Sequence, residues 1–306
     1  MKLSIIIPCY NEEDNVRVIY DEIYNVFNTK KISYELIFVN DGSQDNTFEK
    51  LNELIKQKKQ NIKIVDFSRN FGKEAAIYAG FKNSGGEFVA IIDADLQQRP
   101  ELIVNMLDIL KTNEEYDSVA AYQQKRKEGK ILTFFKNIFY KIINRISSVS
   151  FVQGASDFRI FRRKMVDAII EMSEYNRFSK GIFSFVGFKT YYMPYEVEQR
   201  RNGTSKWSFI KLFNYAIDGI VAYTTLPLRI PFIFSFILLL ISLLLLVLFL
   251  IFGIDLIKIS IVLMLFLIGL VFMTVGILGE YLSKTYLEVK KRPVYIIKDI
   301  KESKVK

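Results

Sequence analysis

The chain has 306 residues, a single cysteine and no histidine, and its 42 basic residues exceed the 33 acidic ones, giving a formal net charge of +9. Cys9 alone excludes an internal disulfide framework and a cysteine zinc site, and the lack of histidine excludes an imidazole base or a His-ligated metal. A basic chain favours anionic partners, and because residues 230–278 are almost wholly apolar, we expect lipid rather than nucleic acid.

The first part of the chain alternates short apolar runs with amphipathic segments. The pattern predicts strands over residues 3–7, 34–39, 62–67 and 88–92, and helices over residues 16–27 and 74–81. The amino terminus carries one charge, and Pro8 interrupts its apolar run, so residues 3–7 indicate a first strand rather than a signal peptide. Such alternation predicts an α/β fold with a mostly parallel sheet and helices on both faces.

A polar loop follows each of these predicted strands. In chain order the loops carry Tyr10 and Glu12, then Asp41, then Arg69 and Asn70, then Asp93 and Asp95. Because ligands of open α/β sheets bind outside the carboxyl ends of the strands, the loops predict one shared site. The two aspartates after the fourth strand suit a metal ion held against a phosphorylated ligand, although a solvated turn has the same composition.

Two basic amphipathic helices are predicted next, over residues 131–146 and 208–225. In the first, one face carries Ile131, Phe135, Ile138, Ile142 and Ile146, and the opposite face is polar and basic. This pattern is typical of a helix lying in a membrane interface, and a helix packed on the sheet has the same periodicity. The apolar segments downstream favour the membrane, so we expect both helices to seat the domain on the bilayer.

Residues 230–254 and 259–278 are each long enough to cross about 30 Å of hydrocarbon and carry no charge in the middle. Basic residues flank the pair, with Arg229 on one side and Lys284, Lys290, Lys291 and Arg292 on the other. By the positive-inside rule, both outer flanks lie in the cytoplasm. The prediction is a multi-pass protein of the plasma (inner) membrane, with a two-helix hairpin, a cytoplasmic domain, both termini in the cytoplasm, and a basic tail over residues 281–306.

Four motifs occur in a familiar order: SIIIPCYNEE at residues 4–13, VNDGS at 39–43, DADLQ at 93–97 and GASDFR at 154–159. With the two apolar segments, they resemble the inverting family 2 glycosyltransferases of GT-A fold. More narrowly, the chain is similar to the polyisoprenyl-phosphate glycosyltransferases, which include dolichol-phosphate mannose synthase and the bactoprenol glucosyltransferases. The resemblance covers nearly the whole chain and implies a GT-A domain over residues 1–225.

The resemblance implies an enzyme that transfers one sugar, glucose or an N-acetylhexosamine, from a UDP-sugar to undecaprenyl phosphate with inversion. The lipid-linked product would serve glycan modification in the cell envelope. Two alternatives stay open: a processive membrane polysaccharide synthase, although the sequence lacks the Gln-x-x-Arg-Trp motif and further spans of such enzymes, and a membrane scaffold that binds a nucleotide without turnover. The oligomeric state is also open, a homo-oligomer included.

The resemblance also implies site residues. The donor-binding residues are Pro8, Tyr10, Glu12, Asp41, Asp93, Ala94, Asp95, Arg200 and Lys206. The ligands of a Mg²⁺ or Mn²⁺ cofactor are Asp95 and Gln97, supported by Asp93. The catalytic residues are Asp157, Asp93, Asp95, Arg200 and Lys206, of which the last two would stabilise charge on the leaving diphosphate.

Plainer roles fit the same residues. Asp41 suits a helix cap, and Asp157 an ion pair with Arg159 or Arg162. The basic loop that contains Arg200 suits attraction to anionic lipid.

The chain departs from its family where the acceptor phosphate would be held. Relatives generally carry an arginine just after the strand that here ends at Gln123, and a basic residue near the start of the first amphipathic helix, where this chain has Thr133. A basic cluster lies nearby, and its Arg126, Lys130 and Lys136 are the predicted acceptor-phosphate residues.

Overall fold

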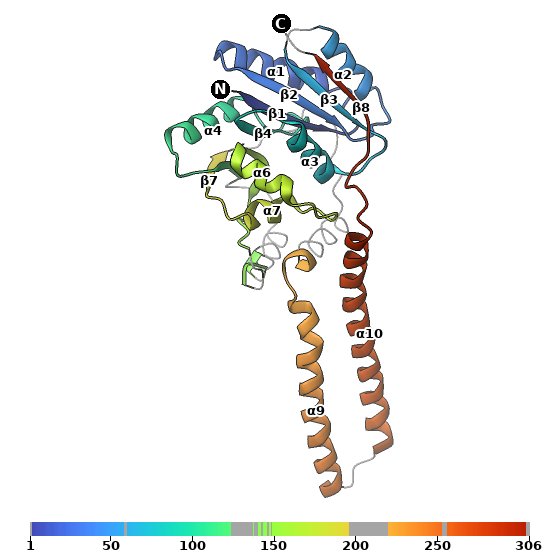
Figure 1. Ribbon diagram of the computed structural model, residues 1–306. Coiled ribbons are helices and arrows are strands. Elements are labelled where there is room, and N and C mark those ends of the chain that lie inside the picture. Colours follow the sequence, from blue (N-terminus) through green and yellow to red (C-terminus); the bar gives the residue numbers. More distant parts are fainter. Residues whose placement is uncertain are drawn as a thin grey trace.

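The computed structural model describes residues 2–57, 60–123, 137, 140–141, 143–145, 147, 149–195, 220–252 and 256–303 (Figure 1). Its centre is an eight-stranded sheet in the order β7-β5-β6-β4-β1-β2-β3-β8. The strands are β1 (Leu3–Cys9), β2 (Tyr34–Asn40), β3 (Ile62–Phe67), β4 (Phe88–Ile91), β5 (Ser118–Gln123), β6 (Ala155–Arg162), β7 (Thr190–Tyr195) and β8 (Ile297–Ser303). The four strands predicted from the first apolar runs are therefore confirmed.

The sheet is mixed but mostly parallel. β1 runs parallel to β2 and β4, β2 to β3, and β5 to β7, whereas β6 is antiparallel to β4 and β5, and β8 is antiparallel to β3. From β1 the chain steps outward to β2 and β3, and then returns to place β4 on the other side of β1. The strand order therefore switches between β1 and β4, and a crevice at their carboxyl ends is the expected ligand site of such a fold.

Helices cover both faces of the sheet, because side chains of successive strand residues point to opposite faces. Ile5 and Ile7 pack in one core with α1 (Val16–Thr29), α2 (Thr47–Lys56) and α4 (Glu101–Thr112). Ile6 packs in the other core with α3 (Lys73–Asn83), α6 (Arg163–Glu171) and α7 (Ser179–Phe185). All three isoleucines are fully buried, and each burial contributes about 1.5–3 kcal/mol.

Strand β8 lies in the segment that the sequence predicts only as a basic tail. It pairs with β3 over Ile62 to Phe67 and forms one edge of the sheet. Its sequence, IKDIKES, has two apolar residues among charged ones, a composition typical of an edge strand exposed to solvent. The sequence does not indicate this strand, because it lacks the mostly apolar run that marks the buried strands.

Two long helices, α9 (Leu226–Phe252) and α10 (Leu256–Val289), extend side by side away from the sheet (Figure 1). They begin near the predicted spans, but α10 continues eleven residues beyond the predicted end at residue 278. Large apolar side chains on them are exposed, among them Phe236, Leu244 and Phe272. Within the described ranges one segment, Phe266–Val289, is long and apolar enough to cross a membrane. This supports a membrane anchor.

The predicted interfacial helices lie largely outside the described residues. In the first, Asn144 donates to the Phe151 carbonyl over 2.9 Å and accepts from the Phe151 N–H over 2.7 Å. Ile143 is buried against Val149 and Phe151. The described part of this segment is thus hydrogen-bonded to, and packed against, the residues that lead into β6. The second helix is described only from Ile220 onward.

Candidate active site

Two of the predicted catalytic carboxylates meet at the carboxyl end of β4. In the antiparallel pair of β4 and β6, Ile91 lies opposite Arg159. Continuing this register by two residues sets Asp93 opposite Asp157. Two like charges placed opposite each other in a sheet repel, so the arrangement needs a counter-ion.

Lys73, the first residue of α3, supplies that counter-ion. Its Nζ lies 2.6 Å from Asp93 Oδ1 and 3.6 Å from Asp157 Oδ2. Although burial disfavours its charge, the two carboxylates raise the pKa of Lys73, so it is an ammonium at neutral pH. Burial alone would raise the pKa of Asp157, but the cations Lys73, Lys180 and Arg159 outweigh it and lower that pKa.

The ion-pair partner of Asp157 is therefore Lys73, which the sequence did not indicate. Arg159 donates to the Ser156 carbonyl, and Arg162 donates to the Tyr116 carbonyl. The second carboxylate oxygen of Asp157, Oδ1, is buried and has no hydrogen-bond partner within the described part of the chain. A buried acceptor of this kind is a candidate contact for a ligand.

The turn after β4 presents three predicted metal-site residues on one side. Asp93, Asp95 and Gln97 are partly exposed, whereas the intervening Ala94 and Leu96 are buried. Leu96 adopts φ +61°, in the left-handed region that non-glycine residues rarely occupy. The Gln97 N–H donates to Asp95 Oδ1 over 3.2 Å. The turn thus holds the two aspartates and the amide together at the switch point.

Gln98 fixes the base of this turn. Its Oε1 accepts from the Asp93 backbone N–H over 2.9 Å, and its Nε2 donates to Asp93 Oδ2 over 3.1 Å. With Lys73 on Oδ1, both Asp93 oxygens are engaged. Asp93 is therefore held in place by the fold, which fits a supporting role beside Asp95 and Gln97.

The donor set fits Mg²⁺ or Mn²⁺ only with help from a ligand. Carboxylate and amide oxygens suit these cations, which commonly keep few protein ligands and complete their shell with phosphates and water. Within the described ranges, no three acidic or cysteine side chains come close enough to form a metal cluster. Asp95 and Gln97 would then hold a cation whose other ligands are substrate oxygens.

Asp41 binds the loop that follows β3. Its Oδ1 accepts from the Phe71 N–H over 2.6 Å, and its Oδ2 accepts from the Gly72 N–H over 2.9 Å. Burial raises the pKa of Asp41 to about 6, although these two amides act against the rise. The helix-cap alternative does not hold, because α2 begins after Asn46 and the carboxylate of Asp41 is engaged elsewhere.

The loops after β2 and β3 touch closely. Gly42 has φ +61°, and a Cβ on it would lie 2.2 Å from the Arg69 carbonyl carbon. Only glycine fits there. Because Lys73 directly follows the amides that Asp41 binds, the same loop reaches both the end of β2 and the acidic pair.

The remaining predicted donor residues lie at the end of β1. Pro8 is within β1 opposite Val39, and Tyr10 is partly exposed just beyond it. The Glu12 N–H donates to Thr47 Oγ1 over 2.8 Å, and Glu12 Oε2 accepts from Asn15 Nδ2 over 2.7 Å. Five predicted residues lie outside the described part of the chain: Arg126, Lys130, Lys136, Arg200 and Lys206.

Comparison with known proteins settles the family. The family described as Glycosyl transferase family 2 matches residues 4–170, more than half of the chain. The chain belongs to glycosyl transferase family 2. This confirms the resemblance that the four motifs carry, and it makes the protein a glycosyltransferase.

Relatives within this family match almost end to end. The Bacillus subtilis protein CsbB is 40% identical over 304 residues, covering 97% of this chain and 91% of its own. A prophage bactoprenol glucosyl transferase homolog of Escherichia coli is 35% identical over 309 residues, covering 99% of this chain and all of its own. The bactoprenol glucosyl transferase of Shigella phage SfV is also 35% identical over 309 residues, with the same coverage.

A solved structure shares the fold. Glucosyl-3-phosphoglycerate synthase from Mycobacterium tuberculosis, crystallised with Mn²⁺, uridine diphosphate and phosphoglyceric acid, aligns with a TM-score of 0.50 and 18% identity. The alignment covers 72% of this chain and 76% of that one. The GT-A-like architecture of this family 2 glycosyltransferase is therefore confirmed.

Beyond the family motifs, sequence reasoning missed Glu74 and Ser179. Glu74 Oε2 accepts from the Ser179 backbone N–H over 2.9 Å and from the Ser179 hydroxyl, which joins α3 to α7. Burial raises the pKa of Glu74 to about 7, and the charge of Asp157 adds to the rise. In the sequence, Glu74 is an acidic residue at the start of a predicted helix. Such a residue is also expected simply because a negative charge in the first turn stabilises a helix, so its position did not indicate a further role.

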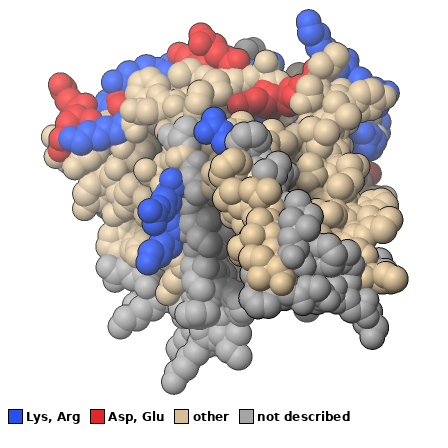
Figure 2. Space-filling view, turned by 90° about the horizontal axis from the view of Figure 1, so that it is seen from below, with Lys and Arg blue, Asp and Glu red and all other residues tan. Residues whose placement is uncertain are grey.

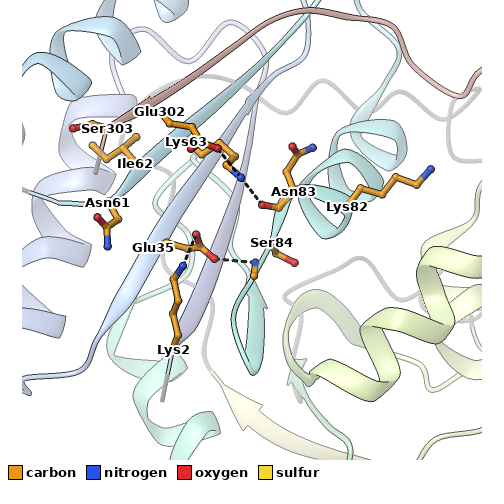
Figure 3. Close-up of a pocket in the computed structure, with 11 residues that line it drawn as sticks. Lys2, Glu35, Asn61, Ile62, Lys63, Lys82, Asn83, Ser84, Glu302 and Ser303 are labelled. Carbon is orange, nitrogen blue, oxygen red and sulfur yellow. Dashed lines mark hydrogen bonds and ion pairs between the residues drawn. The ribbon is translucent and has the colours of Figure 1, made fainter. Parts of the chain in front are cut away.

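A hollow of about 570 Å³ lies at the opposite, amino-terminal edge of the strands (Figure 3). Four of its five charged side chains pair with one another: Lys2 Nζ lies 3.2 Å from Glu35 Oε2, and Lys63 Nζ lies 2.9 Å from Glu302 Oε1, while the fifth, Lys82, lies over the Tyr78 ring. Glu35 also accepts from the Gly85 N–H. Because four of its five charged groups are already paired, the hollow presents few charged groups to a ligand.

Proposed function

We propose that the protein transfers a single sugar, glucose or an N-acetylhexosamine, from a UDP-sugar to undecaprenyl phosphate, inverting the anomeric carbon. The lipid-linked sugar would serve as a donor for modification of cell-envelope glycans. The observation that carries the proposal is the meeting of Asp93 and Asp157 at Lys73, at the switch point of the sheet. The end-to-end similarity to proteins named bactoprenol glucosyl transferase supports the lipid acceptor.

The reaction needs placement more than a base. A phosphomonoester has its second pKa near 6, so at neutral pH a polyprenyl phosphate already carries a nucleophilic oxygen. That oxygen attacks the anomeric carbon, the carbon–oxygen bond to the diphosphate breaks, and UDP leaves with the bonding electrons. Asp157, whose lowered pKa keeps it ionised, would orient the acceptor, and the histidine-free composition raises no difficulty.

A bound Mg²⁺ or Mn²⁺ would neutralise charge on the departing diphosphate. Asp95 and Gln97 would be its protein ligands, with Asp93 supporting the turn. Asp41, together with Pro8, Tyr10 and Glu12, would surround the nucleoside. Arg200 and Lys206 would stabilise the leaving group, and Arg126, Lys130 and Lys136 would hold the acceptor phosphate, as the resemblance implies.

We also propose that α9 and α10 form a two-span hairpin in the plasma membrane, with the catalytic domain and both termini in the cytoplasm. The pairing of the two helices and their exposed apolar side chains support this arrangement. Seen from the side of these helices, acidic and basic side chains of the described part lie together along one rim, and further basic side chains lie on the face itself (Figure 2). Basic groups on this face suit an anionic lipid surface.

A donor panel tests the function. The purified protein in detergent is incubated with UDP-glucose, UDP-N-acetylglucosamine, UDP-N-acetylgalactosamine and GDP-mannose, each with Mg²⁺ or Mn²⁺ and polyprenyl phosphate. One sugar per lipid supports the proposal. A polymeric product would instead indicate a processive synthase, and nucleotide binding without product would indicate a scaffold.

A further inference from the structure

We infer that the segment after α10 is part of the donor site, with Tyr295 acting as a positioning residue for the loop over residues 68–72. This inference rests on the proposed function only in taking Asp41 and that loop as the nucleotide end of the site. Family motifs do not point to Tyr295, which lies beyond the last membrane helix. The contacts that connect it to Asp41 form an unbroken series.

The first contact is made by the backbone. β8 runs antiparallel to β3, and the pairing extends past the end of β3, where the Ser68 N–H donates to the Ile296 carbonyl over 3.0 Å. The register shifts between Asp66 and Phe67, so the edge bends where the loop begins. The returning chain thus holds the first residue of the loop directly.

The second contact is an aromatic series. The ring of Tyr295 stacks on Phe67, with centroids 4.9 Å apart and planes at 11°. Phe67 in turn meets Phe71 edge to face, at 5.7 Å and 89°. Phe67 is almost fully buried, so a shift of Tyr295 on one side is transmitted to Phe71 on the other.

The third contact reaches the functional groups. The Phe71 N–H is the donor that Asp41 Oδ1 accepts, and the next residue, Gly72, donates to Oδ2. The guanidinium carbon of Arg69 lies 4.3 Å from the Phe71 ring centre. Tyr295 therefore supports the side chain whose backbone fixes the Asp41 carboxylate.

The segment is also held at its other end. Glu288, near the end of α10, accepts from the Tyr175 N–H over 2.8 Å, and the Tyr281 hydroxyl donates to the Thr224 carbonyl over 2.6 Å. A short connection, residues 290–294, then leads to Tyr295. The helix that anchors the protein is thus joined through a few residues to the nucleotide loop.

The test measures the dissociation constant of UDP, with Mn²⁺ present, for the wild-type protein and for each variant in detergent. Tyr295→Ala should weaken UDP binding about 3- to 10-fold, the effect of losing one aromatic pair, and raise KM for the donor similarly. Tyr295→Phe, which keeps the ring, should restore both. The KM for polyprenyl phosphate and kcat at saturating donor should change little.

Ile300→Ala is the matched control, because Ile300 is on β8 but 43% exposed and away from the loop. Amide hydrogen exchange gives a second readout: residues 68–72 should exchange faster in Tyr295→Ala than in Ile300→Ala. If Tyr295→Ala does not fold, Tyr295→Leu removes the stack while keeping apolar volume, and the same comparison applies.

The outcomes separate the two proposals. A lowered melting temperature with unchanged UDP affinity in the Tyr295 variant would reduce the residue to a stabilising role and overturn this inference. A wild-type protein that binds UDP but makes no lipid-linked sugar would refute the proposed function, while the affinity comparison still decides the role of Tyr295. A wild-type protein that binds no nucleoside diphosphate overturns both.

Discussion

Replacing Lys73 with methionine removes the ammonium group between Asp93 and Asp157 while keeping a side chain of similar length. The two carboxylates, which the β4–β6 register sets opposite each other, then repel. We expect a loss of both stability and turnover. The variant asks whether the positions of these two carboxylates depend on the cation.

The magnitude follows from burial. An ion pair about 4 Å apart gains about 4 kcal/mol at an effective dielectric constant near 20, before desolvation is subtracted. The side chains retain 43% exposure for Lys73, 27% for Asp93 and 19% for Asp157, so the site lies between a surface pair, worth about 0–1 kcal/mol, and a broken buried pair, which costs about 3–5 kcal/mol. We expect the free energy of unfolding to fall by about 1–3 kcal/mol.

Turnover should fall more than stability suggests. A displacement of about 1 Å in a catalytic group can cost on the order of 10²-fold in rate, so kcat for Lys73→Met should drop by about 10- to 100-fold. Lys73→Arg keeps the positive charge, so its kcat should lie between those of the wild type and Lys73→Met. Lys82→Met is the matched control, since Lys82 is on the same helix but exposed, with its ammonium over the Tyr78 ring.

The assay measures kcat, KM for each substrate, and the melting temperature of full-length protein in detergent. Wild-type kcat and melting temperature in Lys73→Met would refute the reasoning, because the acidic pair would then hold its geometry without the cation. Equal losses in Lys73→Met and Lys82→Met would refute it as well, since they would indicate a general effect of removing positive charge from α3.

Three further predictions concern other parts of the site. Asp95→Asn should abolish transfer at any accessible Mg²⁺ or Mn²⁺ concentration, because it removes the charged ligand that would hold the metal; near wild-type activity would remove Asp95 from the metal site. The pKa of Asp41 in the fold, about 6, exceeds its usual value near 4, so protonation of Asp41 stabilises the folded state. This stabilisation, about 3 kcal/mol, is fully present below about pH 4 and is lost as the pH rises through about 6. Asp41→Asn should therefore flatten the pH dependence of the melting temperature between about pH 4 and 6. Arg126→Ala should raise KM for polyprenyl phosphate strongly and leave UDP-sugar binding unchanged; a silent effect with detergent-solubilised acceptor would mean that the basic cluster docks on the membrane instead.

The sequence predicts the part of the fold that depends on burial. β1 to β4 are runs of apolar residues buried on both sides, and their periodicity is enough to find them. Since these strands are parallel, the polar loops after them necessarily meet at one edge. The placement of Asp41, Asp93 and Asp95 at this one edge therefore follows from the pattern.

The role of Lys73 does not follow from any local pattern. It depends on β6 turning back antiparallel to β4 in a register that sets Asp157 beside Asp93, and pairing register between distant segments cannot be read from composition. In the sequence Lys73 is one of 42 basic residues, at a position where a helix start is expected. Its partners, Asp93 and Asp157, are 20 and 84 positions away in the chain, so no local motif indicates their contact with Lys73.

The loop over residues 68–73 makes the two ends of the site interdependent. Phe71 and Gly72 give their amides to Asp41, and Lys73 binds Asp93 and Asp157. Two residues of extended chain span at most about 7 Å, so the Phe71 amide and the Lys73 backbone cannot move apart independently. A ligand that shifts the Phe71 and Gly72 amides would therefore act on the start of α3 as well. Through this loop, a nucleotide bound at the β2 end would adjust the acidic pair beside which the acceptor is expected to bind.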